Sequence, residues 1–158
     1  MAVATARKIS IERLGPESQP LLEKMYDTFA PLGTAFGLPP IEAGRRRAWL
    51  AEIGKGINLV AFVDGIAAGH LVLLPLDRVA EMAVFVHQDF RRQGIATALA
   101  EAAVREARAA GQSAISVFIN SSNEVARRGL IKFGFRAAWE DLQEAQYVYP
   151  LRREGITR

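Results

Sequence analysis

The residues best suited to chemistry lie in one short segment, residues 91–96 (RRQGIA), between an apolar stretch and an alanine-rich one. The apolar stretch predicts a strand and the alanine-rich one a helix, so the segment should form the turn that opens the helix. The first N–H groups of a helix have no partner within it and lie at the positive end of its dipole. Gly94 and Ala96 let an anion approach them, and Arg91 and Arg92 add positive charge. The sequence therefore predicts a phosphate or pyrophosphate site.

Other phosphate-binding motifs do not fit this segment. A dinucleotide fingerprint needs Gly-x-Gly-x-x-Gly and a nucleotide P-loop needs Gly-Lys-Ser/Thr, and neither pattern is present. Taken alone, the segment is also compatible with an ordinary strand-to-helix connection that carries two solvated arginines.

The elements upstream of this segment follow from periodicity and from turn residues. Apolar residues at helical spacing predict a helix from Leu21 that ends before Pro31, followed by a Gly- and Pro-rich loop at 31–40. A second helix is expected over Ile41–Ile53, with the arginines at 45–47 on a solvated face. Residues 58–63 and 66–74 predict two strands, because the Asp64-Gly65 pair between them suits a tight hairpin.

The segment is expected to follow a buried strand and to open a long helix. The strand is predicted over Glu81–Val86, where the continuous apolar run indicates burial on both faces. The helix is predicted over Gly94–Ala110 and should end at Gly111. Further along the chain we expect a strand at 115–119, a helix at 123–133, and strands at 135–139 and 145–149. The order is α/β, and we expect one domain over residues 1–158.

Composition excludes several classes of protein. The chain has 158 residues, half of them hydrophobic, and no cysteine, so disulfides and thiolate metal sites are impossible. Its net charge of +3 (20 basic against 17 acidic residues) lacks the density of a nucleic-acid-binding arm. No stretch is long enough for a membrane span or a secretory signal. We therefore expect a cytoplasmic protein with neither a nucleic-acid nor a membrane partner.

Two signatures in order give a resemblance to a known family. The first is the segment Arg91-Arg92-Gln93-Gly94-Ile95-Ala96; the second comprises residues 123–126 (NEVA) and 132–135 (KFGF). Together they resemble the two signatures of the GNAT superfamily of acyl-CoA-dependent N-acyltransferases. The resemblance implies a mixed, mostly antiparallel central sheet with splayed strands, flanked by helices.

The same resemblance implies acetyl-CoA as the acyl donor, with no metal, and gives each site residue a role. The strand at 81–86 would diverge from the strand at 115–119, and the pantetheine arm would lie in the gap between them. Main-chain groups of the first strand and of the turn would hold the donor, and Asn123 would contact the arm near the thioester. The implied donor-binding residues are Val84, Phe85, Val86, Arg91, Arg92, Gln93, Gly94, Ile95, Ala96, Thr97 and Asn123.

Transfer of an acetyl group to an amine needs a proton acceptor, because a free lysine, with a pKa of about 10.4, is protonated at pH 7. Glu81, at the start of the apolar strand, is the first candidate for this general base. His87 and Asp89 are further candidates, whereas His70, inside a predicted strand, is expected to be packed and hydrogen-bonded. Many family members have a tyrosine that protonates the leaving thiolate, but Leu130 occupies that position here. Water is then the expected proton source.

The acceptor stays open at this stage. The apolar strand and the arginine-rich helix resemble those of bacterial protein lysine acetyltransferases, which makes a protein lysine one candidate. Small-molecule amines such as a polyamine, an amino acid or an aminoglycoside are alternatives, and the arginines at 45–47 would favour an acidic acceptor. Phe29, Phe36 and Trp49 are expected to pack in a core rather than to line a pocket. A non-catalytic acyl-CoA sensor is a further alternative, and either a monomer or a homodimer is expected.

Overall fold

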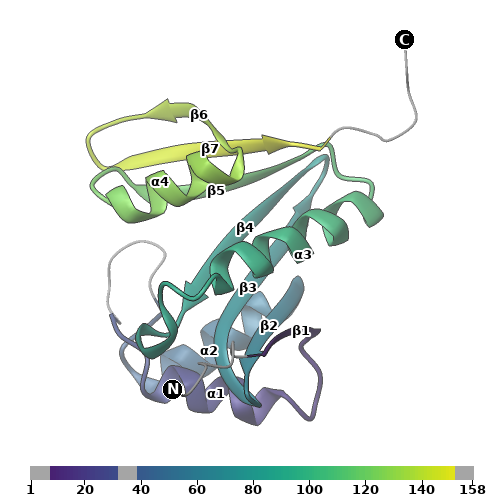
Figure 1. Ribbon diagram of the computed structural model, residues 1–158, viewed down its shortest axis with the longest axis vertical. Helices are drawn as coiled ribbons and strands as arrows, with labels where there is room; N and C mark the ends of the chain where they lie inside the picture. The colour runs from purple at the N-terminus through teal and green to yellow at the C-terminus, as the bar shows by residue number, and fades with distance from the viewer. Residues whose placement is uncertain (1–7, 32–38, 152–158) are drawn as a thin grey trace, which may run out of the picture.

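The computed structural model describes residues 8–31 and 39–151. Within these residues the chain forms a seven-stranded sheet in the order β1-β2-β3-β4-β5-β7-β6 (Figure 1). The strands are β1 (Ile9–Arg13), β2 (Ile57–Val63), β3 (Ile66–Leu76), β4 (Val79–Val86), β5 (Ala114–Asn120), β6 (Arg136–Glu140) and β7 (Glu144–Pro150). Every neighbouring pair is antiparallel except β4 and β5, which are parallel. The mixed, mostly antiparallel fold expected from the sequence is confirmed.

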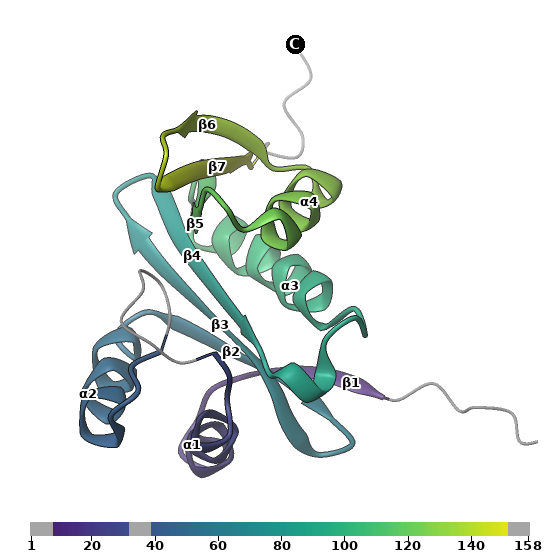
Figure 2. The ribbon, with the colours of Figure 1, turned by 90° about the vertical axis from the view of Figure 1, so that its left-hand side faces the viewer.

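Helices cover both faces of the sheet. They are α1 (Gln19–Asp27), α2 (Ala43–Ile53), α3 (Ile95–Ala109) and α4 (Glu124–Phe133), with a 3-10 turn, η1 (Gln88–Phe90), after β4. Figure 2 shows α1 and α2 on one side of the sheet and α3 and α4 on the other. The apolar side chains accordingly form two buried clusters, one beneath α3 and one beneath α1 and α2. No helix in the described ranges is long and apolar enough to cross a membrane.

Two glycine positions shape the part of the sheet that leads to α3. At the β2–β3 hairpin, Asp64 and Gly65 have φ values of 50° and 81°, as the tight turn predicted from Asp-Gly requires. Gly69, on β3, lies beneath the start of α3. A Cβ at this position would lie 2.8 Å from Ile95 Cγ2 and 3.1 Å from Leu99 Cδ1, so only glycine lets the first turn of α3 pack this closely.

The sheet is split between β4 and β5. These strands pair only at Val79–Ala114, Ala80–Ile115 and Glu81–Ser116. Beyond Glu81 they diverge, whereas β5 stays paired with β7 along its whole length (Figure 1). The splayed strands expected from the family resemblance are thus present, with the apex of the V at Glu81 and Ser116. The split also explains why Ala83, Val84 and Val86 are only partly buried, although the apolar run had predicted burial on both faces.

Some elements differ from the expectations. β1 was not predicted, although Ile9 and Ile11 alternate with polar residues, because it is a short edge strand that pairs with β2 alone. Arg46 is buried rather than solvated, since its guanidinium donates to the main-chain oxygens of Pro40 (3.1 Å) and Ile41 (2.8 Å). Most of the predicted loop at 31–40, including Phe36, lies outside the described residues.

Candidate active site

Beyond Glu81, the edge of β4 that faces β5 pairs with no strand among the described residues. His87 N–H donates to Ala68 O at 2.8 Å, which makes residues 68 and 87 a hydrogen-bonded pair of the antiparallel β3–β4 ladder. Such pairs alternate along the ladder, so Phe85 and Ala83 also direct their N–H and C=O groups toward β3. Val84 and Val86 direct theirs the other way, into the gap beyond the last β4–β5 pair, where Val86 O accepts a hydrogen bond from Arg91 Nε at 3.4 Å.

The N-terminus of α3 offers a second set of main-chain donors. Among the described residues, the N–H groups of Gly94, Ile95, Ala96 and Thr97 donate no hydrogen bond, and Ala98 N–H is the first that bonds back, to Gly94 O at 3.0 Å. Gly94 is the N-cap and has no side chain to cap the helix. These donors lie at the positive end of a 15-residue helix, so the turn is suited to bind an anion.

Backbone conformation explains why the turn has this shape. Arg92 and Gly94 have positive φ values of 62° and 79°. The space around Gly94 is open, because a Cβ there would meet no atom within 4 Å. Glycine is therefore needed at this position for its φ value and not for packing.

The side chains of the turn have different environments. Those of Arg92, Gln93, Ala96 and Thr97 are exposed, whereas Ile95 is buried beneath α3. The guanidinium of Arg91 bonds within the protein: Nη2 donates to Ala30 O at 2.9 Å, and Nε lies 3.4 Å from Val86 O. Arg91 therefore braces the turn against residues 28–30, which directly follow α1 and are called the end of α1 below. The sequence did not indicate this role.

Glu81 lies on the face of β4 that is covered by α2. It is partly buried and borders a cavity of about 120 Å³. Among the described residues that line it, Glu81 alone is ionisable, and the others are Trp49, Ile53, Val72, Leu74, Met82, Ala83 and Phe85. A carboxylate at one end of an apolar cavity is suited to hold or deprotonate an ammonium group that enters it.

Aromatic residues build the wall of this cavity. Phe85 packs edge-on against Trp49, with ring centroids 5.4 Å apart, and Tyr26 packs edge-on against Trp49 at 5.5 Å. Phe29 is buried against both Tyr26 and Phe85, as the core interpretation predicted. Trp49 differs from that interpretation, because it packs in the cluster and also lines the cavity.

The two histidines are structural. His70 is fully buried; Tyr26 Oη lies 2.6 Å from its Nδ1 and Asn58 Oδ1 lies 2.7 Å from its Nε2, which confirms the packed, hydrogen-bonded residue expected from the sequence. Burial lowers the pKa of His70 from 6.5 to about 3. In His87, Nδ1 accepts from Asp89 N–H at 3.1 Å, so the ring proton lies on Nε2, which is 2.9 Å from Thr28 Oγ1. Both ring nitrogens of His87 are thus engaged, which argues against its role as a base.

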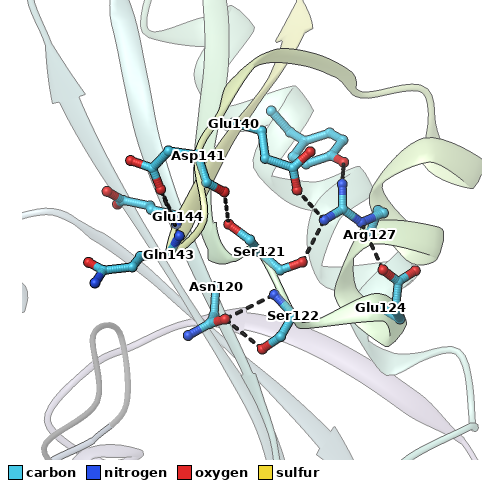
Figure 3. Close-up of polar contacts among 10 residues, drawn as sticks. Asn120, Ser121, Ser122, Glu124, Arg127, Glu140, Asp141, Gln143 and Glu144 are labelled. Carbon is cyan, nitrogen blue, oxygen red and sulfur yellow. Dashed lines mark hydrogen bonds and ion pairs between the residues drawn. The ribbon is translucent and has the colours of Figure 1, made fainter.

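The start of α4 is fixed by a polar network (Figure 3). Asn123 is its N-cap, and Asn123 Oδ1 accepts from Ala126 N–H at 3.1 Å. Arg127 joins α4 to the neighbouring strands: its guanidinium donates to Tyr147 Oη (2.8 Å) and Ser121 O (2.6 Å) and contacts Glu140. Capping uses the oxygen of the Asn123 side chain, and its amide nitrogen donates no hydrogen bond to the described residues.

Two functional candidates were not recognised from the sequence. Ser116 faces Glu81 across the last β4–β5 pair; its side chain is buried, and its Oγ makes no hydrogen bond to any residue in the described ranges. Gln88 bridges η1 and the end of α1 through two hydrogen bonds. Neither position carries a sequence signal, because each depends on a contact between segments distant in the chain. Leu130 packs partly buried against the core, so no hydroxyl is present where many family members have a tyrosine.

Comparison with known proteins identifies the class. The model of the acetyltransferase (GNAT) family matches residues 22–135, which is most of the chain, and the chain therefore belongs to this family. It is an acetyl-CoA-dependent N-acetyltransferase by family, as the sequence resemblance predicted. A search of curated proteins found no match.

Solved structures share the fold at low sequence identity. An N-acetyltransferase from Staphylococcus aureus has a TM-score of 0.75 and 21% identity, over 92% of this chain and 99% of that one. A putative acetyltransferase from Salmonella typhimurium, solved with its cofactor acetyl-CoA, has a TM-score of 0.73 and 18% identity, over 94% and 96%. The ribosomal-protein-S18-alanine N-acetyltransferase of Escherichia coli has a TM-score of 0.72 and 16% identity, over 96% and 100%.

The residues present fit acetyl-CoA. A pyrophosphate needs several convergent N–H donors, and the unbonded N–H groups at residues 94–97 meet this need. A pantetheine arm carries amides that pair as a strand does, and the N–H and C=O groups of Val84 and the N–H group of Val86, on the edge of β4 beyond its last pair with β5, offer partners for them.

Proposed function

We propose that this protein transfers the acetyl group of acetyl-CoA to a primary amine, with Glu81 as the general base. The observation that carries the proposal is the position of Glu81. It lies at the last paired residue of β4, where the gap between β4 and β5 begins, and it borders the apolar cavity beneath α2. A proton acceptor is thereby close to both the predicted path of the donor and a cavity that can receive an amine.

In this proposal the main chain holds the donor and the side chains prepare the acceptor. The N–H groups at residues 94–97 bind the pyrophosphate, and Val84 and Val86 bind the arm. Bound acetyl-CoA supplies an electrophilic thioester carbonyl, and its C–S bond breaks as the new C–N bond forms. Glu81 takes the amine proton directly or through water, and a main-chain N–H on the free edge of β4 stabilises the negative charge that develops on the carbonyl oxygen. Water protonates the thiolate, since a thiol with a pKa of about 8.5 leaves without a strong acid.

The cavity favours an amine on a slender aliphatic stem, such as a lysine side chain. Its small, largely apolar lining suits methylene groups, and a bulkier acceptor such as an aminoglycoside would present its amine from the mouth of the cavity. The faces and edges of Trp49 and Phe85 suit methylene groups, and an aromatic ring near a cation adds attraction. The argument for an acidic acceptor weakens, because Arg46 is buried in contacts with the main chain and Arg45 is paired with Glu42 at 3.5 Å.

The alternative is a protein that binds acyl-CoA without catalysis, which Leu130 favours and Glu81 opposes. A thiol-release assay with acetyl-CoA and a panel of amines separates the two functions. The panel contains lysine peptides, unbranched diamines, amino acids and aminoglycosides, and mass spectrometry detects a gain of one acetyl group. Thiol release that depends on an amine, highest for unbranched amines, supports the proposal. Calorimetric binding of acetyl-CoA without release for any amine would support the sensor.

A further inference from the structure

A group of hydrogen bonds connects the donor side of the site to its acceptor side. The segment 87–91, between β4 and the turn at α3, contacts the end of α1 through three side chains. Gln88 Oε1 accepts from Ala30 N–H at 2.9 Å, and Gln88 Nε2 donates to Thr28 O at 2.6 Å. His87 Nε2 donates to Thr28 Oγ1 at 2.9 Å, and Arg91 Nη2 donates to Ala30 O at 2.9 Å. We call these contacts the Gln88 clasp.

The end of α1 and the last turn of this helix pack against residues that line the cavity beside Glu81. Phe29 lies between the two residues that Gln88 holds, and its ring packs against that of Phe85 with centroids 6.3 Å apart. One turn earlier, Tyr26 packs against Trp49. Phe85 and Trp49 both line the cavity. The position of the end of α1 therefore sets the position of the cavity wall.

On its other side, the clasp belongs to segment 87–91, which connects the two parts of the proposed donor site. Segment 87–91 follows the free edge of β4 at Val86 and precedes the N–H groups at residues 94–97. A ligand that contacts both parts restrains the segment at its two ends. The side chains of Gln88, His87 and Arg91 then pass this restraint to Thr28 and Ala30.

We propose that Gln88 is a positioning residue through which acetyl-CoA binding orders the acceptor side of the site. Gln88 touches neither the proposed donor groups nor Glu81. It acts by holding the end of α1, and through Phe29 it holds the aromatic wall that orients the acceptor amine. This inference rests on the donor site of the proposed function but does not depend on the identity of the acceptor.

Hydrogen exchange tests the clasp directly, because the amide of Ala30 is itself a clasp donor. In the wild-type protein, saturating acetyl-CoA should slow exchange at Ala30 about fivefold or more, together with exchange at residues 94–97. In Gln88→Ala the slowing at 94–97 should remain and the slowing at Ala30 should be lost. Gln88→Glu keeps an acceptor for Ala30 N–H but loses the donor to Thr28, so it should restore part of the effect. Gln143→Ala, which removes an exposed glutamine from the β6–β7 hairpin, is the control and should behave as the wild type.

A kinetic measurement distinguishes positioning from a general loss of structure. With an amine that the wild type acetylates, Gln88→Ala should raise the KM of the amine about fivefold or more and leave the dissociation constant of acetyl-CoA within about twofold. Slowing at Ala30 that persists in Gln88→Ala, or that is missing in a wild type whose residues 94–97 are protected, would overturn the coupling alone. No protection at residues 94–97 in the wild type would overturn the donor site, and the coupling with it.

Discussion

Glu81 faces Ser116 at the last paired position between β4 and β5, and beyond this pair the two strands separate. The side chains of Glu81 and Ser116 lie on the face of the sheet opposite α3, whereas their neighbours Ala80 and Ile115 belong to the core beneath α3. The point where the sheet opens is therefore also the point where the carboxylate of Glu81 borders the cavity beneath α2, with the hydroxyl of Ser116 beside it on the same face of the sheet.

Replacement of Glu81 by glutamine should lower kcat by a factor of about 100 or more, because the amide cannot accept the amine proton. The dissociation constant of acetyl-CoA should stay within about twofold, since the proposed donor contacts are main-chain groups. Steady-state kinetics and calorimetry measure the two quantities. Glu101→Gln, at an exposed position of α3, is the matched control and should leave both unchanged. Full turnover in Glu81→Gln would assign the proton transfer to another group.

Replacement of Gly94 by alanine should weaken acetyl-CoA binding about tenfold, because φ of 79° is unfavourable for a residue with a Cβ and the turn would relax. The strain corresponds to about 1–2 kcal/mol. Calorimetry measures the affinity and urea unfolding the stability. Gly129→Ala is the control: this glycine lies inside α4 with open space around it, so alanine should stabilise the protein by up to about 1 kcal/mol without effect on binding. Equal affinity of wild type and Gly94→Ala would argue against the turn as the pyrophosphate site.

Replacement of Gly69 by alanine should destabilise the protein by about 1–3 kcal/mol, the range for overpacking. The new methyl group would lie 2.8 Å from Ile95 Cγ2 and 3.3 Å from Phe85 O, so the first turn of α3 must move away from the sheet. Urea unfolding measures the change in free energy. An unchanged free energy of unfolding would mean that α3 packs less closely on β3 than described here.

The buried histidine predicts a loss of stability in mild acid. The pKa of His70 is lowered by burial from 6.5 to about 3, so below pH 6.5 the unfolded chain binds a proton that the folded protein does not. The free energy of unfolding should therefore decrease as the pH is lowered from about 6 to 3, by up to about 1.4 kcal/mol per pH unit. Urea unfolding at a series of pH values tests this. In His70→Gln the dependence should be shallower over the same range, and an identical slope in both proteins would assign the effect to other groups.

Local sequence patterns were sufficient for most elements and for the turn before α3. Asp64-Gly65 predicted the hairpin, because the two positive φ values it needs are a local property of these residue types. The turn before α3 was predictable for the same reason: Gly94, a preceding strand and a following helix are adjacent in the chain, and the free N–H groups belong to any helix start. The edge strand β1 was missed, since its five residues form a strand only through pairing with β2.

What the sequence determined by itself is thus the family, the order of most elements and the turn before α3, because each is encoded by neighbouring residues. The tertiary structure decided the rest. The cavity beside Glu81 is lined by Trp49 from α2 and Phe85 from β4. The Gln88 clasp depends on a hydrogen bond from Gln88 to Thr28, which lies 60 positions earlier in the chain. The burial of Arg46 and the low pKa of His70 likewise depend on what the folded chain packs around them. Such contacts produce no local or periodic pattern in the sequence, because the residues come together only when the chain folds.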